Sequence, residues 1–509
     1  MNNEKWEYLR LDTRSISLFR ILLGLSILYN FLFIKLSFVR EFYDEKLGLF
    51  SQKEWRVLNG THSPSIFDFY RNETFAYIFI FVAILICIAF IAGIYTKITS
   101  ILLLFFYYNI QAAVSGYCFG YDFYTYHFLF WSIFLPLSNH FFLTNKFIKN
   151  EVAFYKPPLL FSFIIILQIA ILYFTTGIVK TGPSWLGGYA VRTMALDKFA
   201  TFGIAPILNS SPIIYSTLTY VTLLFEILFP FLLFIKYKWK YLRIIAASIL
   251  ILFHLSVLLS YDVGNFSISG FAAAAILLPD IFWNKLNVLK LTNQFNSKEE
   301  KLKSHNKIIQ FLSLGFVSFA AIVMVNQSVV FMSKQLSDNH KGVFSKVNSI
   351  VSKAELSNPF KFSFFLQNWK MFAPNPPPNC GWLAIEEIKD DGFIYDLISG
   401  ELVKNNEYKL RYSLSGFEKQ LMNPMRAYRY RESWKYRMLL KKWIPYKIKQ
   451  IHPNTTDFKN FNLCEYDFFI SKLNKNQIPP IEKRCYKIKA VMDLPIFVVQ
   501  NDTSQTLKR

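Results

Sequence analysis

The chain has 509 residues, of which 53% are hydrophobic and 18% aromatic, and its formal net charge is +22 at pH 7. A soluble protein of this length would show neither this aromatic excess nor long uncharged runs, so we interpret the chain as an all-α polytopic membrane protein. Lys and Arg gather in cytoplasmic loops and near anionic headgroups, so the charge favours membrane lipids as partners and not nucleic acid.

Charge-poor windows predict about nine transmembrane helices. They cover residues 15–34, 74–96, 98–114, 123–145, 157–179, 213–235, 244–261, 263–284 and 308–333. Only Lys97 separates the second from the third, which predicts a tight helical hairpin. The eighth is the weakest, because Gly264, Gly270, Pro279 and Asp280 interrupt it. The first apolar stretch lacks the features of a cleaved signal peptide, so we expect it to be retained.

The distribution of Lys and Arg predicts the orientation in the membrane. Both are more frequent in the N-terminal segment and in alternate loops after it than in the other short loops. By the positive-inside rule, this places the N-terminus in the cytoplasm and the C-terminus outside. We therefore expect a multi-pass protein of the bacterial inner membrane.

The apolar runs end near residue 333, so we divide the chain into a transmembrane domain, 1–333, and a small extracytoplasmic α+β domain, 334–509. Residues 381–401 alternate around Asp390-Asp391-Gly392, which predicts a β-hairpin. Residues 426–449 are basic and aromatic and predict a helix that lies on a membrane surface, binds an acidic partner or has an ordinary solvated face.

The cysteines support two predictions. Cys464 and Cys485 form a disulfide if the C-terminal domain meets an oxidising compartment. The absence of a CxxC motif predicts no metal site.

Ionisable side chains inside apolar spans are costly unless paired or hydrated, so they are the candidate functional groups. Five stand out: Arg20, His127, Lys180, Glu226 and His254. On the expected topology, Lys180, His127 and His254 lie in the outer half of the membrane, with Glu226 just below. This arrangement predicts an outward-facing cavity lined by these four groups. We expect Arg20 to pair with an acid or to reach the headgroups, and Glu226 to pair with a buried cation or to cap a kink.

Such a cavity suits proton abstraction from a lipophilic substrate such as a quinol. Burial favours the neutral form of an amine, so Lys180 can act as a base, while a nearby histidine holds or relays the proton. The structural alternatives are a Lys180 that anchors the span at the interface, and His127 and His254 that hold helices together by hydrogen bonds. The two histidines do not have the spacing of metal ligands on one helix.

Five strings carry a resemblance to a known family. They are SLFRILLGL (17–25), AGIYTKITSIL (92–102), YFTTGIVKTGPSWLGGY (173–189), HLSVLLSYDVGNFSISGFAAAAILLP (254–279) and QNWKMFAPNPP (367–377). Together they resemble the horizontally transferred transmembrane domain (HTTM) family, which includes the vitamin K-dependent γ-glutamyl carboxylase.

The resemblance implies an enzyme that oxidises a reduced naphthoquinone, menaquinol or vitamin K hydroquinone, with O2. In the carboxylase, the base formed in this way removes a proton from a glutamate side chain so that CO2 can add. A lysine starts the reaction, and the Gly-Ile-x-Lys match places it at Lys180. The resemblance further assigns histidines of the family to His127 and His254, and it implies a secreted peptide or protein as the substrate.

The sequence also departs from the carboxylase. Val179 stands where the carboxylase has a first lysine, the string around His127 lacks its Asn, and residues 386–509 are shorter than the carboxylase's lumenal domain. Other branches of the family are linked to the export or maturation of peptide toxins. The alternative to a quinol-dependent carboxylase-like lyase is therefore a non-enzymatic accessory protein for the maturation or secretion of a small peptide. A transporter is a third reading, but the halves show no internal symmetry.

Overall fold

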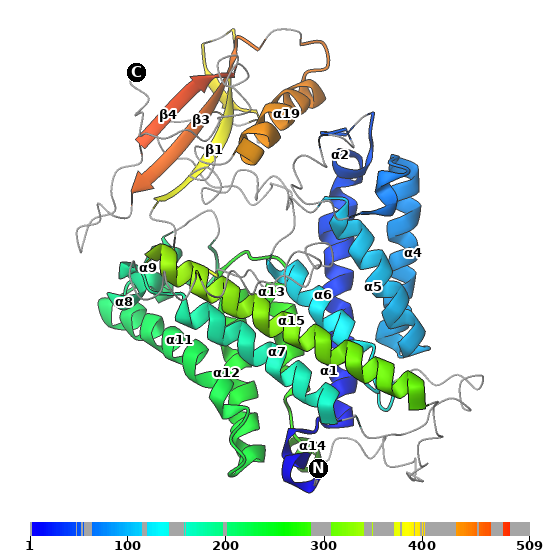
Figure 1. Ribbon diagram of the computed structural model, residues 1–509. Helices are drawn as coiled ribbons and strands as arrows, with labels where there is room; N and C mark the ends of the chain where they lie inside the picture. Colours follow the sequence, from blue (N-terminus) through cyan, green and yellow to red (C-terminus); the bar gives the residue numbers. More distant parts are fainter. Residues whose placement is uncertain are drawn as a thin grey trace. The chain divides into compact units, whose positions relative to one another are not determined.

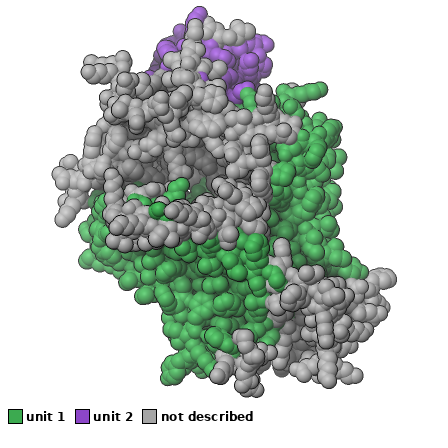
Figure 2. Space-filling view, viewed as in Figure 1, with its two compact units in different colours: residues 1–195, 201–376 green, residues 196–200, 377–509 purple. Residues whose placement is uncertain are grey.

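The computed structural model describes residues 3–46, 48–51, 54, 64–114, 120–141, 157, 159–196, 201–286, 307–339, 349, 371–376, 379–390, 392–397, 400, 402, 434–455, 458–469 and 482–488. The chain divides into two compact units (Figure 2). Unit 1 comprises residues 1–195 and 201–376, and unit 2 comprises residues 196–200 and 377–509. The boundary after residue 333 that we expected from the sequence stays a prediction.

Unit 1 is helical (Figure 1). Its α-helices are α1 (Thr13–Tyr29), α2 (Val39–Tyr43), α4 (Glu73–Ala92), α5 (Thr96–Ala112), α6 (Gly120–Ser132), α7 (Leu159–Ile178), α8 (Pro183–Leu186), α9 (Ala190–Ala195), α10 (Ala205–Leu208), α11 (Pro212–Leu232), α12 (Trp239–Ser260), α13 (Phe266–Ile276), α14 (Asp280–Leu286) and α15 (Lys307–Asn339). Short 3-10 segments are η1 (Asn3–Leu9), η3 (Leu36–Phe38) and η4 (Ile66–Asp68), and η2 (Asn30–Lys35) is a π-helix that continues α1.

Six helical stretches within the described residues are long and apolar enough to cross a membrane. They are Trp6–Tyr43, Glu73–Ala92, Leu159–Ile178, Pro212–Leu232, Trp239–Ser260 and Ser318–Ser337. The chain is thus a membrane protein, but the nine spans expected from the sequence are not confirmed. The windows at 98–114, 123–145 and 263–284 contain α5, α6 and α13, which are only 17, 13 and 11 residues long. A helix rises about 1.5 Å per residue, so these three do not reach across the roughly 30 Å of hydrocarbon by themselves.

The helical hairpin predicted at Lys97 is confirmed. Asn72 caps the start of α4 by accepting a hydrogen bond from the Phe75 N–H, and the helix ends at Gly93 in the left-handed conformation. Helix α5 begins at Thr96 and packs against α4. The reversal is tight because Gly93 adopts its positive φ of 81° without a steric penalty.

The helices that surround the candidate site come from distant parts of the chain. Helix α7 packs against α11 and α15, α11 packs against α12, and α13 packs against α1, α6 and α12 (Figure 1). The approach of α7 to α11 is close, because a Cβ at Gly177 would lie 3.0 Å from Cβ of Glu226. The absence of a side chain at residue 177 is therefore what lets Glu226 lie against the end of α7.

Arg20 has other partners than the acid that we expected. Its side chain is buried on α1, and no acidic residue pairs with it among the residues that the structure describes. Whether it approaches the headgroups stays a prediction. Its guanidinium donates hydrogen bonds to two main-chain carbonyls that follow α6, those of Leu137, at 2.7 Å, and of Phe141. A guanidinium has five N–H donors and can be satisfied by carbonyl oxygens, so a buried Arg does not require a carboxylate.

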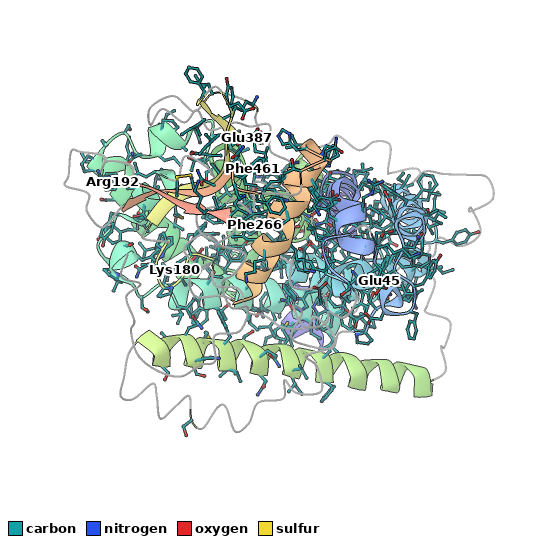
Figure 3. All side chains as sticks on the ribbon, turned by 90° about the horizontal axis from the view of Figure 1, so that it is seen from above. Glu45, Lys180, Arg192, Phe266, Glu387 and Phe461 are labelled. Carbon is teal, nitrogen blue, oxygen red and sulfur yellow. A yellow bond between two sulfur atoms is a disulfide. The ribbon has the colours of Figure 1, made fainter. Side chains whose placement is uncertain are left out.

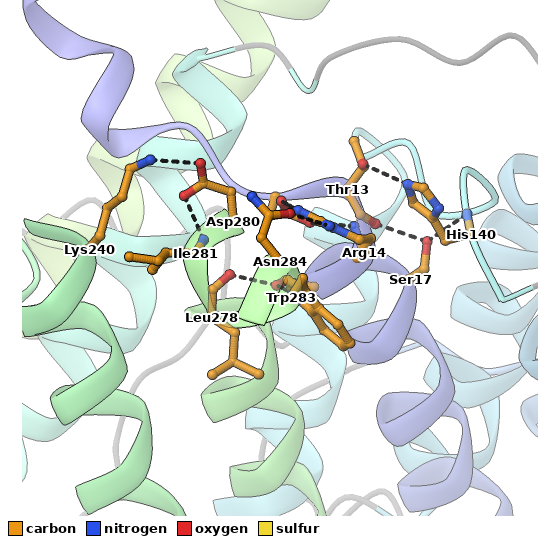
Figure 4. A network of polar contacts seen from close by, with 12 residues as sticks. Thr13, Arg14, Ser17, His140, Lys240, Leu278, Asp280, Ile281, Trp283 and Asn284 are labelled. Atoms are coloured by element: carbon orange, nitrogen blue, oxygen red, sulfur yellow. Dashed lines mark hydrogen bonds and ion pairs between the residues drawn. The ribbon is translucent and has the colours of Figure 1, made fainter. Parts of the chain in front are cut away.

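A polar network surrounds the N-terminal end of α1 (Figure 4). Arg14 donates to the side-chain oxygen of Asn284 in α14 at 3.0 Å. Lys240 of α12 pairs with Asp280 at 2.7 Å, and the two side chains are 38% and 41% exposed. An ion pair this exposed is screened by solvent, so it contributes little to stability.

His140 belongs to the same network and lies outside the spanning helices (Figure 4). Its Nε2 lies 3.0 Å from the Thr13 hydroxyl, and its main-chain N–H donates to the Ser17 hydroxyl at 3.1 Å. Burial lowers the pKa of His140 below its usual value, with a smaller lowering by the charge of Arg14 and an opposing effect of Asp12. His140 is therefore held in its neutral form near pH 7.

Unit 2 contains a four-stranded antiparallel sheet in the order β2-β1-β3-β4. Its strands are β1 (Asn379–Ile388), β2 (Ile394–Asp396), β3 (Phe461–Phe469) and β4 (Glu482–Lys487). The hairpin predicted around Gly392 is confirmed, with Ile388 opposite Ile394. The two cysteines of the expected disulfide, Cys464 and Cys485, lie opposite each other on β3 and β4 and are bonded.

The basic helix is present as α19 (Trp434–Ile451), and residues 426–433 of the predicted stretch lie outside the described residues. Leu440, Trp443, Ile444 and Ile448 form its buried face, at the spacing of an amphipathic helix. Whether its basic face lies on a membrane surface, binds an acidic partner or faces solvent stays a prediction.

Candidate functional site

The candidate site begins at the end of α7, where Tyr173, Gly177 and Lys180 follow one another at helical spacing. Lys180 is labelled in Figure 3. Residues separated by four and three positions lie on one face of a helix. The last turn carries this face past the helix end, because the Lys180 N–H donates to the Gly177 carbonyl at 3.2 Å. Lys180 is 3% exposed, so its amine does not extend into water as an interfacial anchor would.

Lys180 forms an ion pair with Glu226 of α11, and Nζ of the lysine contacts Oε2 of the carboxylate. The two side chains are 2% and 0% exposed. The expectation that Glu226 pairs with a buried cation is thus confirmed. The other carboxylate oxygen, Oε1, has no hydrogen-bond partner among the described residues. A buried acceptor without a partner is costly, so this oxygen is available to a ligand or a proton.

The indole of Trp185, in α8, also contacts the Lys180 amine. The Lys180 Nζ lies 4.5 Å from the centroid of the indole, within the range of a cation–π contact. Trp185 is itself buried, and its Nε1–H donates to the Phe372 carbonyl at 3.1 Å. The carboxylate and the indole face therefore both hold the ammonium group in place.

A second pair of polar groups begins at Tyr173 of α7, about two helical turns before Lys180 in the sequence. The Tyr173 hydroxyl is 2.7 Å from Nε2 of His254 on α12, and both residues are buried. The other ring nitrogen of His254, Nδ1, has no hydrogen-bond partner among the described residues. A Cβ at Gly270 of α13 would collide with the imidazole, so the ring is confined between α12 and α13.

Tyr173 also lies near the first pair. Its hydroxyl interacts electrostatically with Glu226 and with the Tyr124 hydroxyl of α6. Aromatic rings enclose the same region, with Phe229 at 5.2 Å and Phe225 at 5.7 Å from the Tyr173 ring, centroid to centroid. Two polar pairs, Lys180 with Glu226 and Tyr173 with His254, thus lie near each other in an apolar interior.

His127 is buried on α6 and lies one turn from Tyr124. Helix α6 contacts this group through Tyr124, which we did not select from the sequence. We also missed Tyr173 and Trp185. The heptad spacing of Tyr173 and Lys180 is a signal that would have found the first of these. Of the four candidate site residues, the structure brings Lys180, Glu226 and His254 into one connected group.

A separate buried carboxylate, Asp122 in the first turn of α6, was also missed. Its Oδ1 accepts hydrogen bonds from Asn30 at 3.0 Å, Tyr107 at 3.0 Å and Gln111 at 2.9 Å. Asn30 begins the π-helix η2, a distortion that is frequent at functional sites. Three donors from α1 and α5 satisfy this oxygen, so the group joins these helices to α6.

One set of described residues has the ligand types of a metal site, namely Glu386, Cys464 and Cys485 of unit 2. The two sulfur atoms are bonded to each other, so they are not thiolates that bind a metal.

Amine, carboxylate, hydroxyl and imidazole groups placed in this way can transfer protons. An amine and a carboxylate in contact exchange a proton, and desolvation disfavours the charged form of each. When the proton lies on Glu226, Lys180 has a free electron pair and is a base. Tyr173 and His254 extend the path, because a hydroxyl and an imidazole in a hydrogen bond of 2.7 Å also exchange a proton.

One of three comparisons with known proteins found a match. The family model for the HTTM domain matches residues 8–282, more than half of the chain. No curated protein and no solved structure matches the sequence. The matched range contains α1 to α13 and with them Lys180, Glu226, Tyr173 and His254. The chain belongs to the HTTM domain family.

Proposed function

We propose that the chain is a membrane enzyme in which Lys180 acts as a base on a lipophilic acid. The observation that carries the proposal is the buried contact of Lys180 with Glu226, in which the carboxylate can take the proton of the ammonium group. The neutral amine then accepts a proton from the substrate. A structural ion pair would not need Tyr173 in electrostatic range of the same carboxylate, nor the hydrogen bond of that hydroxyl with His254.

A reduced naphthoquinone, menaquinol or vitamin K hydroquinone, fits the residues that are present. Two buried polar atoms, Oε1 of Glu226 and Nδ1 of His254, have no hydrogen-bond partner among the described residues and can bind hydroxyl groups. The rings of Phe253 and Phe266 lie 5.2 and 4.7 Å from the His254 ring and offer apolar contact. When bound, the quinol would supply an acidic hydroxyl and, on oxidation by O2, a base strong enough to remove a carbon-bound proton so that CO2 can add.

Each residue of the group has its own role in the transfer of protons. Glu226 Oε2 takes the proton of the ammonium group, and the neutral Lys180 Nζ then accepts the proton of the substrate. The Tyr173 hydroxyl and Nε2 of His254, 2.7 Å apart, offer a path by which the proton on Glu226 leaves toward the imidazole. His127 remains part of the proposal through the family resemblance. The substrate that receives CO2, or undergoes a related modification, is a secreted peptide or protein.

We further propose that the protein spans the bacterial inner membrane several times, with the N-terminus in the cytoplasm and unit 2 outside. The distribution of Lys and Arg supports this orientation. The bond between Cys464 and Cys485 in unit 2 also supports it, because disulfides persist in oxidising compartments. Alkaline phosphatase fused to the C-terminus should be active, and an inactive fusion at normal abundance would refute the orientation.

The replacement of Lys180 by Arg tests the enzymatic role. Arginine keeps the positive charge beside Glu226 but does not give up its proton, so it cannot act as the base. We expect Lys180→Arg to abolish activity at unchanged abundance in the membrane. The matched control is Lys97→Arg, at an exposed position in the first turn of α5.

The readout is the mass of secreted proteins from cells with and without the chain. A gain of one CO2 per modified side chain should require the wild-type protein, survive Lys97→Arg and disappear with Lys180→Arg. If Lys180→Arg supports the full native phenotype, the enzymatic role is wrong and the accessory role in peptide maturation or secretion replaces it.

A further inference from the structure

Residues 371–375, which we name the strap, lie against the segment that follows Lys180. Three hydrogen bonds join them across nearly two hundred residues of chain. The Gly182 N–H donates to the Pro374 carbonyl at 3.0 Å, and the Ser184 N–H donates to Oδ1 of Asn375 at 2.9 Å. The third runs from the Trp185 indole to the Phe372 carbonyl at 3.1 Å.

The contact is also close in its packing. A Cβ at Gly182 would collide with the amide of Asn375, so the glycine leaves room for this side chain to reach the Ser184 N–H. Val179, directly before Lys180, forms a buried apolar cluster with Ala373 of the strap and Phe331 of α15. The strap therefore fixes the chain on both sides of Lys180.

The backbone of the strap is held in an unfavourable conformation. Met371 and Phe372 have φ angles of 35° and 66°, in the left-handed region that residues with a Cβ seldom adopt. Such conformations persist where the surrounding contacts impose them, and they concentrate at functional sites. This backbone conformation places the Phe372 carbonyl where it accepts the hydrogen bond of the Trp185 indole.

Trp185 contacts both the strap and the Lys180 amine. An indole that donates its N–H to a fixed carbonyl cannot rotate freely about its side-chain torsions. Its face then stays at 4.5 Å from Lys180 Nζ, the atom that also contacts the carboxylate of Glu226. Loss of the strap contact would release the ring and, with it, one side of the amine's enclosure.

We propose that Asn375 and Trp185 are positioning residues for Lys180: the strap seats the indole against the ammonium group and shields it from water. The proposal rests on the proposed function only in giving the enclosed amine a catalytic purpose. The enclosure itself is measurable without any activity.

The test is the rate at which an amine-reactive acylating reagent modifies Lys180 in the full-length protein in membranes, followed by mass spectrometry. Removal of the Asn375 acceptor should raise this rate in Asn375→Ala by about fivefold, the equivalent of one net hydrogen bond in a local opening equilibrium. Asn375→Asp retains an acceptor oxygen and should restore protection. The control Ser184→Ala should leave the rate unchanged, because residue 184 contributes its main-chain N–H to the contact.

Trp185→Phe separates the two parts of the indole's role, because it keeps an aromatic face and removes the donor to Phe372. We expect this variant to label at a rate close to that of Asn375→Ala. Wild-type rates in both variants would overturn the proposal, and so would a failure of Asn375→Asp to restore protection at normal abundance.

A catalytic readout distinguishes positioning from stability. If the proposed function holds, Trp185→Phe should lower kcat at unchanged KM and shift the pH at which kcat is highest. Loss of folded protein alone would lower kcat equally at every pH. If the wild-type protein shows no quinol-dependent activity, the proposed function fails, and the labelling rates still decide whether the strap encloses Lys180.

Discussion

The buried ion pair gives the most quantitative prediction. Lys180→Met and Glu226→Leu each remove one charge and leave its partner in an interior where the two side chains are 2% and 0% exposed. At this exposure solvent does not screen the remaining charge, and breaking a buried pair from one side costs about 3–5 kcal/mol. Each single variant should lose this amount of unfolding free energy. The double variant has no unpaired charge and should lie within about 1 kcal/mol of the wild type, because apolar replacement of both partners is often neutral or stabilising.

The assay is reversible unfolding in mixed micelles of a mild detergent and dodecyl sulfate, followed by circular dichroism. Lys240→Met is the matched control, because Lys240 pairs with Asp280 at 2.7 Å but the two side chains are 38% and 41% exposed. An exposed pair contributes about 0–1 kcal/mol, so this variant should change little. If Lys180→Met costs no more than Lys240→Met, or if the two single effects simply add in the double variant, the amine and carboxylate are not a buried coupled pair.

Three further predictions concern neighbouring features. Tyr173→Phe should cost about 1–3 kcal/mol in the same assay, because buried His254 then has no partner at Nε2, and a cost near zero would contradict the hydrogen bond. Gly270→Ala should cost about 1–3 kcal/mol through collision with the imidazole, whereas Gly315→Ala, where a Cβ would meet no atom within 4 Å, should be neutral or stabilising. The folded-state pKa of His140 lies below its unfolded value of about 6.5, so unfolding free energy should fall as pH drops below that value and stay level above it, and His140→Gln should remove this dependence.

Local patterns in the sequence were sufficient for several elements. The turn after α4 depends on Gly93 and its neighbours, and the hairpin of unit 2 depends on Gly392, so a reader of the sequence sees the determinants directly. The membrane class follows from apolar windows in the same way. The number of spans does not, because hydropathy records apolar composition over a window, whereas the ends of α5, α6 and α13 depend on tertiary contacts.

The candidate site was predictable where charge alone determines the partner. A buried cation was one of the two roles expected for Glu226, and Lys180 was the cation that the resemblance had already singled out. Arg20 has the same cost of burial, but the carbonyls that satisfy it belong to residues more than a hundred positions away. Tyr173 and Trp185 were missed because an aromatic residue in a membrane protein carries little information until its neighbours are known.

The bond between Cys464 and Cys485 has a practical consequence for handling the protein. A protease that cuts anywhere between these residues would leave the two fragments covalently attached, so damage would escape notice on a gel run without reductant. Production in a host that exports unit 2 to an oxidising space, and a paired gel with and without thiol, would reveal whether a preparation is intact.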